Sequence, residues 1–230
     1  RPTLLRDAES ATGVARILVV LAGENQIAVV PGSNGRLTPV DLRQHRELIA
    51  EARVLLLQME IPRETVFEAL RLGRECGLTT ILNPAPAAPL PSDLLRLVDI
   101  LTPNESEAQV LTGSTDPAEA AQILTGRGVG TVVVTCGANG AFLTTGNDVT
   151  HIPGFLVETI DSTGAGDAFN GALACAVAEG VPLKSAIERA NAAGALATTG
   201  RGAQESMPTK DDIEQLCRSG VRQMEPRQRS

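Results

Sequence analysis

The sequence predicts an α/β fold, an open and mostly parallel β-sheet with helices on both faces. First, short apolar runs such as residues 53–58 and 131–135 alternate along the chain with longer segments of helical spacing. Second, hydrophobic residues make up 43% of the 230 residues and charged residues 20%, a balance typical of a globular protein. Third, aromatic residues make up only 2%, so the core has to be aliphatic, as in a Val/Ile/Leu-rich parallel sheet covered by helices.

The first half of the chain alternates strand and helix signals. A Gly-Glu-Asn turn between two apolar runs indicates a hairpin. Thr38 stands where it can cap the next helix, and the continuous apolar run 53–58 predicts a strand buried on both faces. Pro62 suits the first turn of a further helix, and Gly77 its end. The expected elements are strands 13–21 and 26–30, helix 39–50, strand 53–58, helix 62–75, strand 79–82, helix 90–97 and strand 98–101.

The second half continues the alternation. A strand over residues 155–160 is expected to lead into a glycine-rich segment that opens a long helix. We expect one domain over residues 1–217 and a loose, arginine-rich tail over 218–230. The expected elements are helices 104–111 and 117–126, strands 131–135, 142–145 and 149–152, and helices 165–179, 183–199 and 210–216.

Charge and composition exclude several classes of protein. The formal net charge of −7 argues against nucleic acid as a partner, because such a footprint needs a basic face. The chain has no signal peptide and no long apolar run, so we expect a soluble, cytoplasmic protein without a membrane partner. The four cysteines and two histidines are isolated in sequence and give no zinc-binding spacing, and we interpret the cysteines as buried free thiols.

The most informative stretch runs from Asp161 to Gly171 and reads DSTGAGDAFNG. It opens an apolar helix, and the first amides of a helix carry unsatisfied donors and partial positive charge that favour an anion. Gly164 and Gly166 lack the Cβ atoms that would keep a phosphate away from the backbone. The stretch therefore predicts a phosphate site at a helix N-terminus.

Asp167 is unexpected beside such a site, because a carboxylate repels phosphate. In phosphoryl transfer it has a use, since it can orient an acceptor hydroxyl and take its proton. The alternative is an ordinary acidic residue in a first helical turn, stabilised by the helix dipole. The chain has no P-loop motif, and Gly164 and Gly166 lack the third glycine of the dinucleotide-binding fingerprint.

Several motifs together resemble the ribokinase (PfkB-type) carbohydrate kinase family. The glycine-rich run matches the family's C-terminal signature, and the resemblance covers about residues 12–216, favouring the ribokinase branch. It implies ATP-dependent transfer of a phosphoryl group to the 5-hydroxyl of D-ribose, with Mg²⁺ and with K⁺ as monovalent activator. The other matching segments, in chain order, are Gly13-Val14-Ala15, Gln58-Met59-Glu60, Asn83-Pro84-Ala85-Pro86-Ala87, residues 102–108 (TPNESEA) and residues 135–140 (TCGANG).

The resemblance assigns catalytic and substrate-binding roles. Asp167 is similar to the family's catalytic base, which also contacts the sugar, and Glu60 is placed to reach a sugar hydroxyl, although it also fits a strand-end charge in solvent. Gly164, Ala165 and Gly166 are similar to the family's anion hole. The resemblance implies ATP contacts from Asn104, Thr135, Gly137, Ala138, Asn139, Gly140, Gly166 and Asn191.

Two metal sites are also implied. Asn104 and Glu107 match the motif that positions Mg²⁺ and the phosphates, although Asn at a helix N-cap with Glu three residues on is equally a capping box. The remaining matches concern the monovalent cation, and most of them would contribute backbone carbonyls. These positions are Asp161, Thr163, Ala197, Gly200, Gly202 and Ser206.

The chain departs from the family at its beginning. It starts at Arg1 without Met, and the family's first part, with a sugar contact, a small β lid and a Gly-Gly-Lys-Gly loop, is not found in it. We therefore expect an N-terminally truncated kinase, nearly inactive and unstable or oligomeric by itself, with a homodimer left open for the full-length protein. The alternatives are another PfkB-family sugar or nucleoside kinase, or a silent nucleotide-binding fragment, which would have no need of Asp167.

Overall fold

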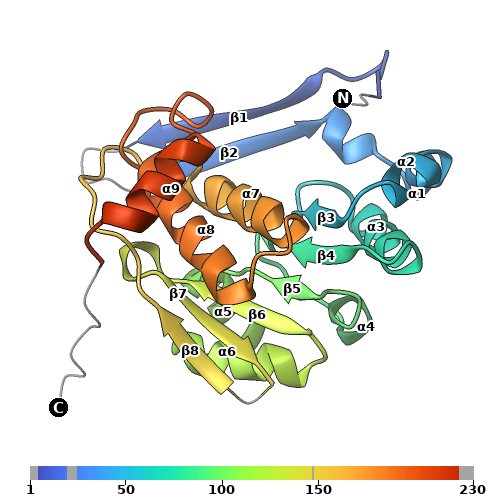
Figure 1. The fold of residues 1–230 in the computed structure, drawn as a ribbon. Helices are drawn as coiled ribbons and strands as arrows, with labels where there is room; N and C mark the ends of the chain where they lie inside the picture. The colour runs from blue at the N-terminus through green and yellow to red at the C-terminus, as the bar shows by residue number, and fades with distance from the viewer. Residues whose placement is uncertain (1–4, 20–24, 147, 223–230) are drawn as a thin grey trace.

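The computed structural model describes residues 5–19, 25–146 and 148–222, and it confirms the predicted α/β class. Within these residues a six-stranded sheet lies between two layers of helices, and a separate two-stranded hairpin runs along one side of the molecule (Figure 1). The hairpin strands pair antiparallel, as the sequence predicted, whereas residues 20–24, with most of the expected turn, lie outside the described residues. The strands are β1 (Thr12–Val19), β2 (Asn25–Gly32), β3 (Val54–Leu57), β4 (Thr79–Leu82), β5 (Ile100–Leu101), β6 (Thr131–Thr135), β7 (Ala141–Thr145) and β8 (Asp148–Ile152).

The large sheet has the order β3-β4-β5-β6-β7-β8. Strands β3 to β6 are parallel, whereas β7 and β8 add to the edge as antiparallel strands. Because the parallel strands all end on the same side, the loops after β4, β5 and β6 gather at one edge of the sheet, where ligands bind in such folds. The helices are α1 (Pro39–Gln44), α2 (Arg46–Ala50), α3 (Arg63–Glu75), α4 (Ser92–Leu95), α5 (Glu105–Thr112), α6 (Pro117–Gly126), α7 (Ala165–Ala178), α8 (Leu183–Ala197) and α9 (Lys210–Ser219), with short 3₁₀ turns η1 (Ser33–Arg36) and η2 (Gly137–Asn139).

Successive side chains of the central strands point to opposite faces of the sheet, and each face has its own hydrophobic core. Leu82 and Leu101 face one side of the sheet, where they pack with residues of α3 to α6. Their neighbours Ile81 and Ile100 face the other side, where they pack with α7 and α8. A residue period of two therefore explains why the central strands are apolar throughout: both of their faces are covered.

Strand β3 corrects one expectation. The run 53–58 was predicted to be buried on both faces, but β3 is the first strand in the sheet order and Leu56 is 39% exposed. Among the described residues β3 pairs only with β4. An apolar run alone does not distinguish a central strand from an edge strand.

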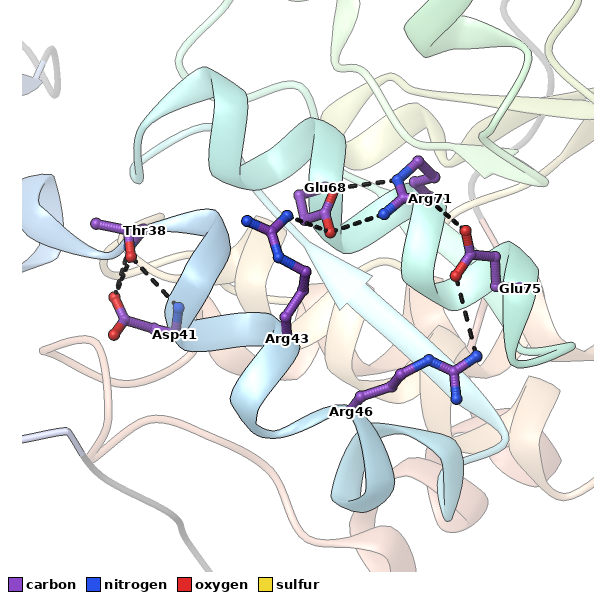
Figure 2. Close-up of polar contacts among 7 residues, drawn as sticks. All are labelled: Thr38, Asp41, Arg43, Arg46, Glu68, Arg71 and Glu75. Atoms are coloured by element: carbon purple, nitrogen blue, oxygen red, sulfur yellow. Dashed lines mark hydrogen bonds and ion pairs between the residues drawn. The ribbon is translucent and has the colours of Figure 1, made fainter.

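The expected helix 39–50 is divided in two at His45. Its cap is confirmed, since Thr38 and Asp41 form a capping box. The break has a local cause: the Nδ1 of His45 lies 2.8 Å from the carbonyl oxygen of Asp41, the acceptor that a continuous helix would use. Helix α1 is fastened to α3 by Glu68, which binds both Arg43 and Arg71 (Figure 2).

The remaining differences lie near the ends of elements. Residues 155–160 do not form the expected strand, and only Phe155 makes an isolated bridge. Helix α9 runs to Ser219, three residues beyond the expected end, so Arg218 and Ser219 belong to this helix and not to the expected loose tail. Residues 223–230 of that tail lie outside the described residues. The described thiols are free, but only Cys136 is buried and Cys175 is exposed, which corrects the interpretation that all are buried. None of the helices in the described part of the chain combines the length and apolar character needed to span a bilayer.

Candidate active site

The glycine-rich segment forms the N-terminus of α7. Gly164 is the N-cap, with φ of 80°, and the Ala165 amide donates to the carbonyl of Ser162 at 3.2 Å. The amides of Gly166 and Asp167 have no acceptor among the described residues, and both residues are exposed. Donors that a helix leaves unsatisfied in its first turn can bind an anion.

Asp167 stands in this first turn with an unused carboxylate. It makes no ion pair or side-chain hydrogen bond with any residue in the described ranges. The carboxylate is therefore not consumed by a structural contact and is available to accept a proton from a bound hydroxyl.

A cavity of about 320 Å³ lies beside the start of α7. Three segments form it: the end of β6 with turn η2, the irregular segment after β8, and the facing sides of α7 and α8. Its lining is mostly apolar, with one helix N-terminus at its margin, a combination that suits a nucleoside next to phosphates. Its lining residues include Thr135, Gly137, Ala138, Gly140, Phe155, Leu156, Val157, Ala165, Gly166, Asn191 and Thr198.

The cavity collects most of the residues that the sequence associated with ATP. Asn139 does not line it, but its carbonyl oxygen lies 2.8 Å from Nε2 of His151, which holds turn η2 against β8. Cys136, at the start of this turn, is buried, and burial raises the pKa of its thiol to about 12. The thiol thus stays protonated, and the side chain contributes to the hydrophobic core.

The side-chain amide of Asn191 makes hydrogen bonds to the backbone. Asn191 is 7% exposed, and its Nδ2 donates to the carbonyl oxygens of Ile152 at 3.1 Å and Pro153 at 3.3 Å. These bonds fix the segment that follows β8 to helix α8. Asn191 therefore shapes the cavity wall as well as lining the cavity.

Asn104 and Glu107 form the expected capping box at the start of α5. Oδ1 of Asn104 accepts from the Glu107 amide at 2.8 Å, and Glu107 Oε2 accepts from the Asn104 amide at 2.9 Å. Asn104 also bridges to Thr135, which brings this helix start next to the cavity. Burial raises the pKa of the Glu107 carboxyl, and the bond from Asn104 only partly offsets this. Neither residue lines the cavity itself.

The residues assigned to the monovalent cation meet around Asp161. Its carboxylate accepts from the amides of Thr163 at 3.0 Å and Gly202 at 3.2 Å. The Thr163 amide bond is the main reason that the pKa of Asp161 lies below its usual range, so the group stays charged at neutral pH. Ser206 donates to the Gly202 carbonyl, and the end of α8, with Ala197 and Gly200, lies close by, since the Asp161 amide donates to the Thr198 carbonyl.

Glu60 lies apart from this constellation. It follows β3, the edge strand, and its side chain is exposed. It does not line the cavity beside α7.

A buried polar link between the sheet and α7 was not expected from the sequence. The Thr102 hydroxyl donates to Asn170 Oδ1 at 2.6 Å, and Asn170 Nδ2 donates to the Gly166 carbonyl at 2.9 Å. Asn83, which follows β4, extends this link, because its Nδ2 donates to the Thr102 carbonyl oxygen. In the sequence, the feature that could have indicated this link is Asn170, a polar residue on the apolar side of its helix. These bonds position the N-terminus of α7 over the ends of β4 and β5.

This fold and site define an α/β protein whose site, at the carboxyl edge of the sheet, suits an anionic, partly apolar ligand. The model of the pfkB family carbohydrate kinases matches residues 3–210. The chain therefore belongs to the pfkB family of carbohydrate kinases.

Individual relatives agree with this assignment. Ribokinase of Haemophilus influenzae is 39% identical over 209 residues, which are 89% of this chain and 68% of that protein. Ribokinase of Bacillus subtilis is 38% identical over 205 residues, with the same two coverages. Among solved structures, Thermotoga maritima ribokinase is similar with a TM-score of 0.83 and 34% identity, covering 91% of this chain and 71% of that one. Arabidopsis thaliana ribokinase in complex with ribose and ATP also gives 0.83, at 30% identity, covering 92% and 70%.

Proposed function

We propose that this chain carries the nucleotide-binding and phosphoryl-transfer machinery of an ATP-dependent kinase that phosphorylates D-ribose at its 5-hydroxyl. The observation that carries the proposal is the start of α7, where Gly166 lines the apolar cavity. Among the described residues, the amides of Gly166 and Asp167 have no acceptor and the Asp167 carboxylate has no hydrogen-bond or ion-pair partner. The substrate follows from the relatives, since several of those most similar are named ribokinases and one was solved with ribose and ATP.

The transfer step follows from these groups. The adenosine occupies the cavity, and the γ-phosphate lies against the amides of Gly166 and Asp167. The Asp167 carboxylate takes the proton of the sugar hydroxyl while its oxygen forms the new bond to phosphorus and the bond to the β-phosphate oxygen breaks, releasing ADP. The helix amides stabilise the negative charge that is spread over the transferring group.

Mg²⁺ belongs to the proposal through Asn104 and Glu107. Glu107 uses one carboxylate oxygen for its capping bond, and burial makes its charge costly. A divalent cation would lower that cost and, once bound there with ATP, would neutralise phosphate charge. We assign to these two residues the positioning of the metal and the phosphates beside the cavity.

A monovalent cation, K⁺, fits the group around Asp161. The carboxylate is kept ionised by the backbone amides of Thr163 and Gly202, and residues 161–163 and 197–206 would supply backbone carbonyl oxygens to the ion. The residues proposed for the site are Asp161, Thr163, Ala197, Gly200, Gly202 and Ser206. Its effect would be to set the shape of the loop that precedes α7.

Three further properties belong to the proposal. The described thiols are free, which suits a reducing cytoplasm. A homodimer is also proposed, and the exposed valines Val14 and Val30, which pair across the hairpin and share one face of it, would be its contact. Residues 1–217 are proposed as the kinase domain.

Ribose-dependent release of ADP tests the proposed function. We expect turnover with D-ribose to exceed that with 2-deoxyribose, and ³¹P NMR of the product to show phosphate on the 5-oxygen. 2-Deoxyribose is the matched competitor because relatives named deoxyribokinase are 34% identical. Faster turnover with 2-deoxyribose than with D-ribose would contradict the proposal.

A further inference from the structure

The chain that follows α9 turns back onto the cavity wall. The Gly220 amide donates to the Leu216 carbonyl at 2.7 Å, which ends the helix, and the Leu156 amide donates to the Val221 carbonyl at 2.9 Å. Phe155 and Arg222 form an antiparallel bridge. Residues 220–222, here called the C-terminal strap, thus lie against residues 155 and 156.

Arg222 fixes the strap at both sides. Its guanidinium carbon lies 3.9 Å from the centre of the Phe155 ring, within the range of a cation–π contact. It also pairs with Glu188 of α8 at 3.9 Å, where both side chains are 34% exposed. Phe155 is only 2% exposed, so its ring is held between the strap and the core.

Gly220 provides an independent sign that this contact is built into the sequence. A Cβ atom at position 220 would lie 2.5 Å from the Leu216 oxygen and 2.8 Å from Cδ1 of Phe155. Both separations are shorter than real contacts, so any other residue would push the strap away from the ring. The glycine therefore permits the close approach on which the Arg222 contact depends.

Phe155 and Leu156, the residues that the strap holds, line the cavity beside α7. We propose that Arg222 is a positioning residue for nucleotide binding, which fixes the apolar wall against which the nucleoside end of ATP packs. The phosphate end lies at the amides of α7, which the strap does not touch. The inference rests on the proposed function, because it takes ATP as the occupant of the cavity.

Calorimetric titration of the 230-residue chain with ATP, and separately with inorganic tripolyphosphate, tests the inference. Arg222→Ala should raise the Kd for ATP about three- to tenfold and leave the Kd for tripolyphosphate unchanged. Arg222→Lys, which keeps a cation over the ring, should recover part of the loss. Arg218→Ala is the control, because Arg218 is 72% exposed and, among the described residues, pairs only with Glu214 on α9.

A second variant guards against simple unfolding. Phe155→Leu keeps an apolar wall without a ring, and in this background Arg222→Ala should cost no further ATP affinity. An Arg222→Ala protein that binds ATP as tightly as Arg218→Ala, or that loses both ligands equally, would overturn the inference. A wild-type chain that does not bind ATP would instead overturn the proposed function, and the inference with it.

Discussion

Gly140 shows how a single missing side chain shapes the nucleotide cavity. It lies after turn η2 with φ of 92°, and a Cβ atom there would come within 2.1 Å of the Ile152 oxygen and 2.4 Å of the Gly154 nitrogen. The backbone of the turn therefore lies directly against the segment that follows β8. A side chain at this position would separate two walls of the cavity.

Gly140→Ala is expected to abolish measurable ATP binding, because both the positive φ and the backbone contact oppose the methyl group. Gly137→Ala is the matched control. Gly137 also has a positive φ, of 53°, but open space surrounds its missing Cβ, so only backbone strain remains. Titration with ATP measures the difference, and equal losses in the two variants would show that the contact with Ile152 is unimportant.

At the scale of elements, helix α3 is tied to α1 by a nearly buried carboxylate. Glu68 is 8% exposed and accepts from Nε and Nη2 of Arg71, both at 3.0 Å, and from Arg43 at 2.9 Å (Figure 2). The hydrogen bonds from Arg71 are the main reason that the pKa of Glu68 is lowered below 4.5. The fold therefore favours the ionised form of this group.

The sign of the pH dependence follows from that direction. Because the folded state has the lower pKa, the stabilising contribution of Glu68 is complete above its ordinary pKa and is lost as the pH falls through the folded value. Glu68→Gln should lower the free energy of unfolding at neutral pH by about 1–2 kcal/mol. It should also reduce the loss of stability between about pH 5 and about pH 3.

Urea unfolding across that pH range provides the measurement. Glu75→Gln serves as the control, since Glu75 also pairs with Arg71 but is 41% exposed and its ion pair is screened by water. Parallel pH profiles for wild type and Glu68→Gln would contradict the assignment.

Asn104, at the start of α5, is a helix cap and is also proposed to position the Mg²⁺–phosphate group. Variants of Asn104 separate these two roles. Asn104→Ala removes the N-cap and should cost about 0.5–2 kcal/mol of stability. Asn104→Ser restores a side-chain cap but not the amide proposed to position the Mg²⁺–phosphate group. We therefore expect Asn104→Ser to regain most of the stability, measured by thermal unfolding, while turnover at saturating ribose stays reduced. Full turnover in Asn104→Ser would show that Asn104 acts as a helix cap and does not position the Mg²⁺–phosphate group.

At the scale of the whole molecule, the repeating parts of the fold could be predicted from the sequence. Strands 79–82 and 131–135 and helix 117–126 agree with β4, β6 and α6, because apolar period and cap residues are local properties. The division at His45 and the edge position of β3 could not be predicted, since they depend on a side-chain contact and on which strands are neighbours.

The candidate site divides in the same way. The start of α7 and turn η2 could be found from glycines and a following helix, both contiguous in sequence. The link from Thr102 to Asn170 and the contact between Arg222 and Phe155 join residues far apart in the chain. Only the packing of the sheet against α7 and the return of the chain after α9 bring them together.

The first turn of α7 is held over the ends of β4 and β5 beside the cavity, and it carries the Asp167 carboxylate proposed to accept a proton during phosphoryl transfer. Asp167→Asn keeps the shape of the side chain and removes the base, so it tests this claim most directly. In this variant we expect ribose-dependent turnover to fall by about two to four orders of magnitude while the Kd for ATP stays at the wild-type value. Turnover of Asp167→Asn at the wild-type rate would contradict this claim.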